Sequence, residues 1–534
     1  MKFKRAWWSG VFAFLGWSLV FGLIYAQSPL YTSNQNTYFL HGLAQAGFGY
    51  LDHDWLASTQ ELMPVFSGLV YLTYLIFHSE IPSYAYYALL MGVYLFSMYG
   101  IMDTLFDLRR SKARTLAFTA LLLAFHSAAL RFVLSRGVDP DATFLFEGGV
   151  AGQRILGQVF QPSAFGVFLT LSVYLFLRKR YIWSLVPMAL AIYFHPVYIL
   201  AGALLTIAYM WILWRDEKNL RKSFLLGLVS LLLVAPSVAY TAYINWSSSP
   251  TVAAQVLDIL VNFRNPHHAL IASWLDWTVA VKAVILLMAL FIVRRTRLFP
   301  ILVLITLGVL ILTATQVMSA SNTLALLFPW RVSILLVPLG LAVLIGFAVT
   351  RVMDIWIISS AVSTVVKIGK PATSKIKAAW KALAEVERWV IGLSLLLITG
   401  LMAIGVMRFQ IEYTRLRSGE ARPMMAWVAA NRTPADVYLI PSKMADFRLV
   451  TGMPVYVDFE TAPDRSEDVL EWYRRLQLVY AFYNGQTDPC QALHDFAMNE
   501  GLTLAIVPTG DPDTACPSLP AVFADATYVI YAIK

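Results

Sequence analysis

Long apolar runs separated by short polar loops make up most of the chain. A membrane-spanning helix needs roughly 20 apolar residues, and many of the runs come close to that length. The runs fall at residues 7–27, 83–102, 115–133, 159–177, 181–195, 196–214, 223–243, 278–293, 298–316, 324–349 and 389–407. This pattern predicts a polytopic α-helical membrane protein with about eleven transmembrane helices.

The pattern changes after Met407, where short strand-like runs begin to alternate with helix-like segments. Such alternation is typical of a small α/β domain, here expected to have a mainly parallel sheet. The predicted strands are Val437–Pro441, Pro454–Phe459, Leu502–Val507 and Tyr528–Ile533, and the predicted helices are Glu467–Phe482 and Cys490–Asn499. We therefore expect a transmembrane domain over 1–407, with a first outer loop at 28–82, and an α/β domain over 408–534.

Composition agrees with a membrane protein, and the charges orient the chain. Of the 534 residues, 58% are hydrophobic and 14% are charged, and the net charge of +9 comes mainly from short loops. The basic clusters are Lys2–Arg5, Arg109–Arg114, Arg178–Arg180, Arg215–Lys222, Arg294–Arg297 and the stretch from Arg351 to Arg388. Because basic loops stay in the cytoplasm, we expect a multi-pass inner-membrane protein with a cytoplasmic N-terminus and an extracytoplasmic C-terminal domain. The positive charge then sets topology and does not indicate a nucleic-acid partner.

Three segments and the two cysteines add detail to this predicted topology. Pro64–His78 is apolar but short for a crossing, so we expect a helix lying on the outer membrane surface. Met1–Arg5 and the run behind it resemble a signal peptide without an obvious cleavage site, which predicts an uncleaved first span. Lys367–Lys381 fits either an amphipathic helix on the anionic inner leaflet or a solvated linker. The two cysteines, Cys490 and Cys516, fit either an extracytoplasmic disulfide or two free thiols.

Three ionisable residues follow one another in the first outer loop: Asp52, His53 and Asp54. Ionisable groups at a membrane face are costly to desolvate, so a cluster of them is a candidate functional site. A carboxylate at a partly dry interface can act as a general base on a hydroxyl group, provided that its pKa is raised. Asp54, or else Asp52, is therefore the candidate catalytic residue. The alternative is a solvated loop in which an aspartate caps a helix.

Cationic residues on the same side are candidates for binding a phosphate. Arg331 lies several residues inside an apolar run, and a buried guanidinium needs an anion, for which phosphate suits its planar fork. An intramembrane ion pair with an acid of another span is the alternative. Arg264, His267 and His268 share a long outer loop that suits a phosphate or a sugar. Adjacent histidines rarely point at one metal ion, so a divalent metal is not favoured and no cofactor is expected.

Two further residues belong to the candidate binding set. His195 precedes Pro196, which ends its helix near the outer mouth of the bundle, although a satisfied core histidine is the alternative. Arg154 lies in the Gly-rich outer loop Gly148–Gln161, whose flexibility suits a loop that closes over a substrate.

The plan of residues 1–410 resembles the GT-C superfamily of integral-membrane glycosyltransferases, which includes the protein O-mannosyltransferases and the lipid A aminoarabinose transferase. The matching pieces are Asn34–Tyr38, Asp54 with Trp55, the helix Pro64–His78 and the turn Leu108–Lys112. The resemblance implies an active site on the outer face and a sugar donor linked to polyprenyl phosphate.

One position departs from the family. Its acidic pair would fall near Asn34, Gln35 and Asn36, and an amide cannot act as a general base at neutral pH. Either Asp52 or Asp54 has taken over the role, with Asn36 left as a binding residue, or the protein keeps the fold without that chemistry.

The leading hypothesis is an inverting glycosyltransferase that moves a sugar from polyprenyl phosphate to a lipid, glycan or protein acceptor on the outer face. Asp54 or Asp52 would deprotonate the acceptor, and Arg331, with Arg264 or the two histidines, would hold the donor phosphate. Two alternatives remain: a catalytically inactive GT-C-like scaffold that binds a partner through its external domain, and a transporter of lipid-linked glycan. The absence of an obvious inverted repeat weighs against the transporter.

Overall fold

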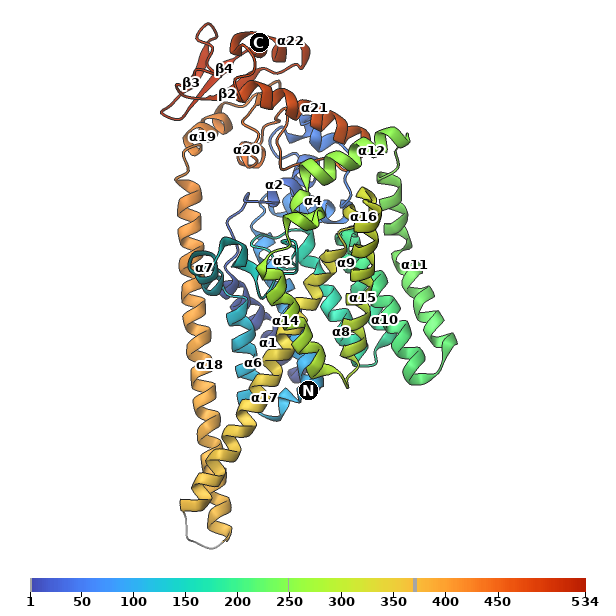
Figure 1. Cartoon of the computed structure of the whole chain (residues 1–534). Helices are drawn as coiled ribbons and strands as arrows, with labels where there is room; N and C mark the ends of the chain where they lie inside the picture. Colours follow the sequence, from blue (N-terminus) through green and yellow to red (C-terminus); the bar gives the residue numbers. More distant parts are fainter. Residues whose placement is uncertain (1, 248, 368–371) are drawn as a thin grey trace.

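A helical bundle with a small sheet at one end forms the molecule, in a computed structural model that describes residues 2–247, 249–367 and 372–534. The C-terminal sheet lies at the opposite end of the bundle from the N-terminus (Figure 1). The predicted fold class, a polytopic helical protein with a C-terminal α/β region, is confirmed.

The bundle is built from the apolar runs of the sequence. Its helices are α1 (Lys2–Tyr25), α5 (Pro82–Phe106), α6 (Lys112–Phe125), α7 (Ala128–Gly137), α8 (Val167–Leu177), α9 (Tyr181–Phe194), α10 (Ile199–Glu217), α11 (Leu220–Ile244), α14 (Trp277–Val293), α15 (Leu298–Ser319), α17 (Ser333–Lys367) and α18 (Ala372–Arg417). In the described residues seven helices are long and apolar enough to cross a membrane, or eight if the pair α6–α7, bent by 44°, is one span. The other predicted spans fall on shorter apolar helices, so the total of eleven stays a prediction.

The C-terminal region contains four helices and a four-stranded sheet. They are α19 (Arg422–Asn431), α20 (Phe447–Thr451), α21 (Ser466–Tyr483) and α22 (Pro489–Asn499), with β1 (Tyr438–Leu439), β2 (Leu504–Pro508), β3 (Ala521–Ala524) and β4 (Tyr528–Ala532). α18 continues to Arg417, and the predicted domain boundary at 407/408 stays a prediction.

The prediction of a mainly parallel sheet is wrong. The strand order is β1-β2-β4-β3, and among these strands only β1 and β2 pair in parallel. The predicted strand Pro454–Phe459 contributes a single parallel bridge, from Val455 to Tyr438. β3 and β4 are joined by a tight turn in which the Asp525 side chain accepts hydrogen bonds from the backbone N–H groups of Thr527 and Tyr528. Such a short connection can only produce an antiparallel pair. β3 was not predicted, because most of its side chains are exposed and it lacks the usual alternation.

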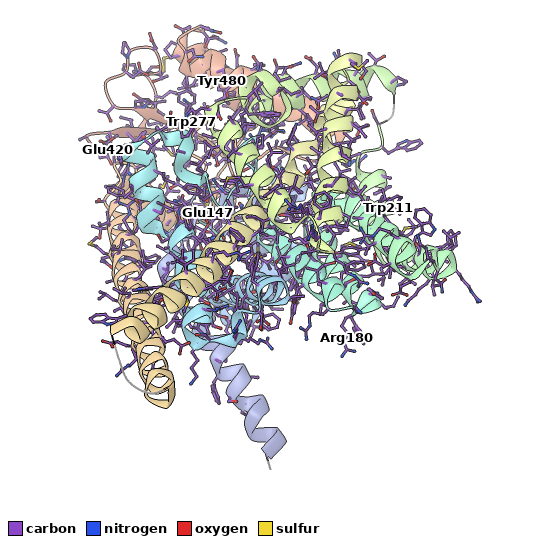
Figure 2. The ribbon with its side chains drawn as sticks, turned by 60° about the horizontal axis from the view of Figure 1, so that its bottom comes forward. Glu147, Arg180, Trp211, Trp277, Glu420 and Tyr480 are labelled. Atoms are coloured by element: carbon purple, nitrogen blue, oxygen red, sulfur yellow. A yellow bond between two sulfur atoms is a disulfide. The ribbon has the colours of Figure 1, made fainter. Side chains whose placement is uncertain are left out.

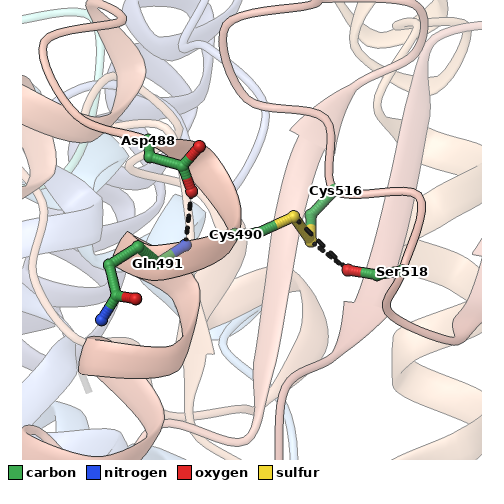
Figure 3. Close-up of a disulfide and its surroundings, with 5 residues drawn as sticks. All are labelled: Asp488, Cys490, Gln491, Cys516 and Ser518. Atoms are coloured by element: carbon green, nitrogen blue, oxygen red, sulfur yellow. Dashed lines mark hydrogen bonds between the residues drawn. A yellow bond between two sulfur atoms is a disulfide. The ribbon is translucent and has the colours of Figure 1, made fainter.

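A compact core and one disulfide hold this region together. Trp472 of α21 is fully buried and donates a hydrogen bond from its indole N–H to the carbonyl of Asp458, 2.9 Å away. Cys490, at the start of α22, is bonded to Cys516, and Asp488 accepts a hydrogen bond from the backbone of Gln491 beside it (Figure 3). Of the two states that the sequence left open for the cysteines, the disulfide is the one observed.

The basic turns gather at the end of the bundle away from the sheet. The turns between α8 and α9 and between α10 and α11 both lie there (Figure 1). Arg180, in the first of these turns, likewise lies far from Tyr480 of α21 (Figure 2). The predicted basic segment Lys367–Lys381 lies outside the residues whose side chains the structure describes.

The first outer loop packs directly against the C-terminal region. It forms α2 (Gln35–Tyr38), α3 (Leu40–Gln45) and α4 (Pro64–Phe77), so the helix predicted at 64–78 is present. Gly49 and Gly452, both with positive φ, approach so closely that a Cβ atom on Gly49 would collide with the backbone of Gly452. The backbone N–H of Tyr50 donates to the Gly452 carbonyl at 2.8 Å. The first outer loop and the segment around Gly452 are therefore in direct contact, although they lie far apart in the sequence.

Candidate functional site

Arg331 lies just before the N-terminal end of α17, in the short helix η9 (Pro329–Val332). The residue before this helix, Phe328, has a φ of +44°, a strained conformation for a bulky side chain, and such strain concentrates at functional sites. The Arg331 guanidinium lies 5.2 Å from the centre of the Phe328 ring. Its Nη1 donates to Nε2 of His195 at 3.0 Å, while its buried Nε has no hydrogen-bond partner in the part of the chain that the structure describes.

His195 is the buried residue that ends α9. Because a guanidinium can only donate, Nε2 of His195 must accept, and the imidazole is therefore neutral with its proton on Nδ1. That Nδ1 is also buried, with no partner among the described residues. His195 is therefore buried beside Arg331 but is not the fully satisfied core histidine that the sequence left as the alternative.

Arg264 approaches the same space from the C-terminal end of the π-helix η7 (Ile259–Arg264). π-Helical turns are rare and are frequent at functional sites. Nη2 of Arg264 donates to the carbonyl of Glu460 at 2.6 Å, and its Nε has no partner among the described residues. Burial lowers the pKa of Arg264, which shows how little solvent compensates its charge.

His267 and His268 follow in the short helix α13 (Pro266–Ala269), with their rings 4.0 Å apart. Nδ1 of His268 donates to the carbonyl of Ala151 at 2.7 Å, which leaves Nε2 as an acceptor. Burial, then the neighbouring His267 and Arg331, lower the pKa of His268 to about 3, so this ring is neutral at physiological pH. The described part of the chain holds no group of three or more side chains suited to a metal ion.

Tyr38 is influenced electrostatically by both Arg331 and Arg264. Burial raises the pKa of its hydroxyl, Arg331 and Arg264 act to lower that pKa, and Asp464 acts to raise it. The hydroxyl is therefore within electrostatic reach of both guanidinium groups. We call Arg331, Arg264, His195, His268 and Tyr38 the outer arginine site. Within the described ranges, neither arginine forms an ion pair with a carboxylate, and both keep an unpartnered buried N–H.

Asn36 lies in α2, two residues before Tyr38. Its side chain is buried and its Oδ1 has no hydrogen-bond partner in the described chain. A binding role for Asn36 stays a prediction.

Two carboxylates that the sequence did not single out for the site lie nearby. Asp464 accepts a hydrogen bond from the backbone N–H of Leu62 at 2.7 Å, and burial raises its pKa to about 6. Glu61 accepts from the Ser67 hydroxyl, and burial raises its pKa to about 7. His41 lies 3.9 Å from Glu61, and its Nε2 is buried without a partner. We call Glu61 and Asp464 the acid pair. Nothing in the sequence around Asp464 distinguishes it, because its burial depends on the docking of the first outer loop.

Asp54 has a different environment from the one expected of a base. It is fully buried, and its Oδ1 accepts from the backbone N–H groups of Leu56 at 2.9 Å and Ala57 at 3.3 Å. Its Oδ2 accepts from Nε of Arg448 at 2.7 Å and from the backbone of Val455 at 2.9 Å. Arg448 also pairs with the buried Asp458. We call Asp54, Arg448 and Asp458 the ion triad; it ties the first outer loop to the C-terminal region.

Asp52, unlike Asp54, lies on the surface of the protein. Its side chain is 59% exposed, and its carboxylate lies 3.8 Å from Nε2 of His53. His53 in turn donates from Nδ1 to the carbonyl of Pro434. The structure therefore separates the predicted pair: one aspartate is exposed and the other is held in the ion triad. A catalytic role for either one stays a prediction.

Arg154 belongs to another part of the bundle. Its guanidinium stacks 4.0 Å over the Phe144 ring, close to the buried ion pair between Arg131 and Glu147. Glu147 lies well inside the bundle (Figure 2). The prediction that the loop 148–161 closes over a substrate stays a prediction. Most of its residues are buried, and its backbone is held, for example by the Ser333 hydroxyl, which accepts from the N–H of Val150 at 2.7 Å.

A domain of unknown function (DUF6798) matches residues 419–479. No curated protein matches the chain. Among solved structures, ArnT from Cupriavidus metallidurans, bound to undecaprenyl phosphate, is similar with a TM-score of 0.47 and 16% sequence identity, over 98% of each chain.

Proposed function

We propose that the protein is a GT-C-type glycosyltransferase that binds a sugar donor linked to polyprenyl phosphate at the outer arginine site. One observation carries this proposal: Arg331 and Arg264 both keep an open buried N–H, and neither forms an ion pair in the described residues, although Glu460 and Asp458 lie within electrostatic reach of Arg264. A buried cation without an anion is strongly unfavourable, so the site is suited to an anion that arrives with a ligand. The planar guanidinium fork suits phosphate.

The reaction follows from these positions. The acceptor hydroxyl attacks the anomeric carbon of the sugar; a new carbon–oxygen bond forms while the bond from that carbon to the phosphate oxygen breaks. Negative charge grows on the departing phosphate, and Arg331 and Arg264 would stabilise it there. His195 and His268 are neutral, so they do not compete with the arginines as charges and are free to orient hydroxyl groups of the sugar.

The proton of the acceptor hydroxyl needs a base. The sequence favours Asp54 or Asp52, but the geometry favours the acid pair. All acceptor positions that Asp54 offers are engaged in the ion triad and in backbone hydrogen bonds. Asp464 lies within electrostatic reach of Tyr38, and raised pKa values of about 6 for Asp464 and about 7 for Glu61 suit proton transfer near neutrality.

The proposal places the site on the extracytoplasmic face. The disulfide between Cys490 and Cys516 supports this orientation, because disulfides persist in oxidising compartments. The polyprenyl carrier follows from the sequence resemblance, and the acceptor is a lipid, glycan or protein hydroxyl.

The test is transfer by the purified full chain from radiolabelled polyprenyl-phosphate sugars to membrane acceptors. We expect Arg331→Gln and Arg264→Gln each to lower the rate by about 100-fold, the usual cost of one lost charge-stabilising donor. Asp464→Asn and Glu61→Gln are compared with Asp54→Asn to identify the base. Arg474→Gln is the matched control, since Arg474 pairs with Glu471 and Glu500 on the surface.

Transfer that is unaffected by both arginine variants would refute the phosphate site. No transfer with any donor would favour the scaffold, in which case the same variants should leave the binding of a partner by the external domain unchanged.

A further inference from the structure

A second polar pocket lies between the outer ends of α1, α7 and α18. Its volume is about 150 Å³, roughly ten times the space that one water needs on the same measure. Polar side chains dominate the wall, among them Gln27, Ser135, Gln158, Arg408 and Glu412. Arg408 follows directly on the apolar run of α18, so the pocket is at the level where a bilayer's headgroups begin.

The charges of the pocket decide what it can hold. Arg131 also lines it, but its charge is already matched, since its Nη1 pairs with Glu147 at 3.2 Å and its guanidinium also donates to two backbone carbonyls. This leaves one cation and one anion, Arg408 and Glu412, which are 3.1 Å apart and partly exposed, at 28% and 38%. Arg131 and Glu147 are buried against each other, so Arg408 and Glu412 are the charged groups of the pocket that a ligand can reach. A purely anionic group is therefore a poor match, whereas a group with one charge of each sign fits.

Apolar side chains lie next to the pocket residues Phe132 and Arg408 along the same two helices. Phe132 and Val133 of α7 and Val406 and Met407 of α18 are all exposed on the flank of the bundle. In a membrane-spanning chain such side chains face lipid. The Phe132 ring also lies 4.8 Å from the Arg408 guanidinium, so lipid-facing and charged groups meet at the opening. An occupant with a polar head and an apolar tail would contact both.

We propose that this pocket binds the zwitterionic phosphate headgroup of a membrane lipid, of the aminoalkyl-phosphate class. The phosphate accepts hydrogen bonds from Arg408, and the ammonium donates to Glu412, so that the ligand replaces their mutual ion pair. Such binding involves no covalent step and does not depend on the glycosyltransferase activity.

The experiment measures binding to the purified full chain in detergent by calorimetry. The ligands are dihexanoyl phosphatidylethanolamine, dihexanoyl phosphatidic acid, free O-phosphoethanolamine and inorganic phosphate. We expect the phosphatidylethanolamine to bind most tightly. Arg408→Gln should weaken it about tenfold, the usual value of a hydrogen bond to a charged group. Glu412→Gln should remove the preference over phosphatidic acid.

Two further variants keep the test decisive. Arg408→Lys retains the charge and should keep most of the affinity, which separates lost binding from misfolding. Arg388→Gln is the matched control, because Arg388 is exposed on the same helix and bonds only to the carbonyl of Ala384 among described partners. Unchanged binding in Arg408→Gln, or tighter binding of phosphatidic acid than of phosphatidylethanolamine by the unaltered chain, would overturn the proposal. Equal affinity for free O-phosphoethanolamine would overturn the assignment to a lipid.

Discussion

The ion triad and the outer arginine site bury the same functional group in opposite ways. Arg448 meets two buried carboxylates, Asp54 and Asp458, which more than neutralise it. Arg331 meets a neutral histidine nitrogen and an aromatic ring, with no carboxylate in the described part of the chain. Burial of a charge is costly in both places. In the ion triad the protein itself supplies the compensation, whereas at the outer arginine site we propose that a ligand supplies it.

The difference in partners between Arg448 and Arg331 predicts a structural role for the first and a functional role for the second. Arg448 joins two segments of the chain, so its contribution should appear in stability. Arg331 joins nothing that needs its charge, so its contribution should appear in binding and catalysis. Variants of the two arginines should therefore separate an effect on stability from an effect on binding and catalysis.

The largest expected effect is on stability, from Arg448→Leu. It leaves two buried carboxylates facing each other without a cation, which should cost about 3–5 kcal/mol of unfolding free energy. Chemical denaturation in detergent, followed by tryptophan fluorescence, measures the loss. Adding Asp54→Asn and Asp458→Asn to the same chain should recover part of it, because the stranded charges are then gone. Arg474→Leu on the surface is the control, expected to cost at most about 1 kcal/mol. Equal losses in the two arginine variants would remove the contrast.

Arg331→Gln should have the opposite profile. We expect transfer to fall about 10²–10³-fold, since a donor aimed at the departing phosphate is lost. The unfolding free energy should stay the same or rise, because a buried cation without its own anion is removed. The measurements are the initial rate with a polyprenyl-phosphate sugar and the thermal unfolding midpoint of the same preparation. A loss of several kcal/mol without a specific loss of rate would make Arg331 a structural residue like Arg448.

The contrast also explains what the sequence could predict. Apolar runs are local, so the positions of the spanning helices and of α4 followed directly from them. Arg331 was identifiable for the same reason, as a charge inside an apolar run. Its contact with His195 was not, because the two residues come together only when α9 and the start of α17 pack side by side.

The role of Asp54 was beyond the sequence for a related reason. Its partner Arg448 lies 394 residues away, and no local pattern indicates that a loop and a distant domain will share a buried ion pair. Asp464 became a candidate only because the first outer loop covers it. The strand β3 was missed because its side chains are mostly exposed, so it lacks the alternation by which a half-buried strand is recognised.

Ionisation of the acid pair should determine how the rate of sugar transfer depends on pH. A base must be ionised, so the rate should fall about tenfold per pH unit below the pKa of about 6 that burial gives Asp464. Asp464→Asn should lower the rate about 100-fold and flatten this limb. The same raised pKa acts on stability: the folded state holds the proton more tightly than the unfolded state, whose pKa is near 3.8. Stability should therefore fall as pH rises from about 4 to 6, and less so in the variant.

The control for this experiment is Asp495→Asn, since Asp495 is an exposed carboxylate of α22. It should leave both the rate profile and the slope of stability with pH unchanged. An acidic limb that persists in Asp464→Asn but disappears in Glu61→Gln would move the role of base to the other member of the acid pair.

The smallest expected effect is that of Asp52→Asn, and it decides between the sequence prediction and the geometry. Asp52 is mostly exposed and contacts only the half-exposed His53, so its removal should change the unfolding free energy by no more than about 0.5 kcal/mol. Transfer should stay within about twofold of the unaltered chain, because water screens the charge and the outer arginine site lies elsewhere. Asp54→Asn should instead weaken the ion triad and lower stability. A 100-fold loss of rate in Asp52→Asn, with stability intact, would show that the sequence had named the base correctly and that the acceptor approaches over the exposed face of the first outer loop.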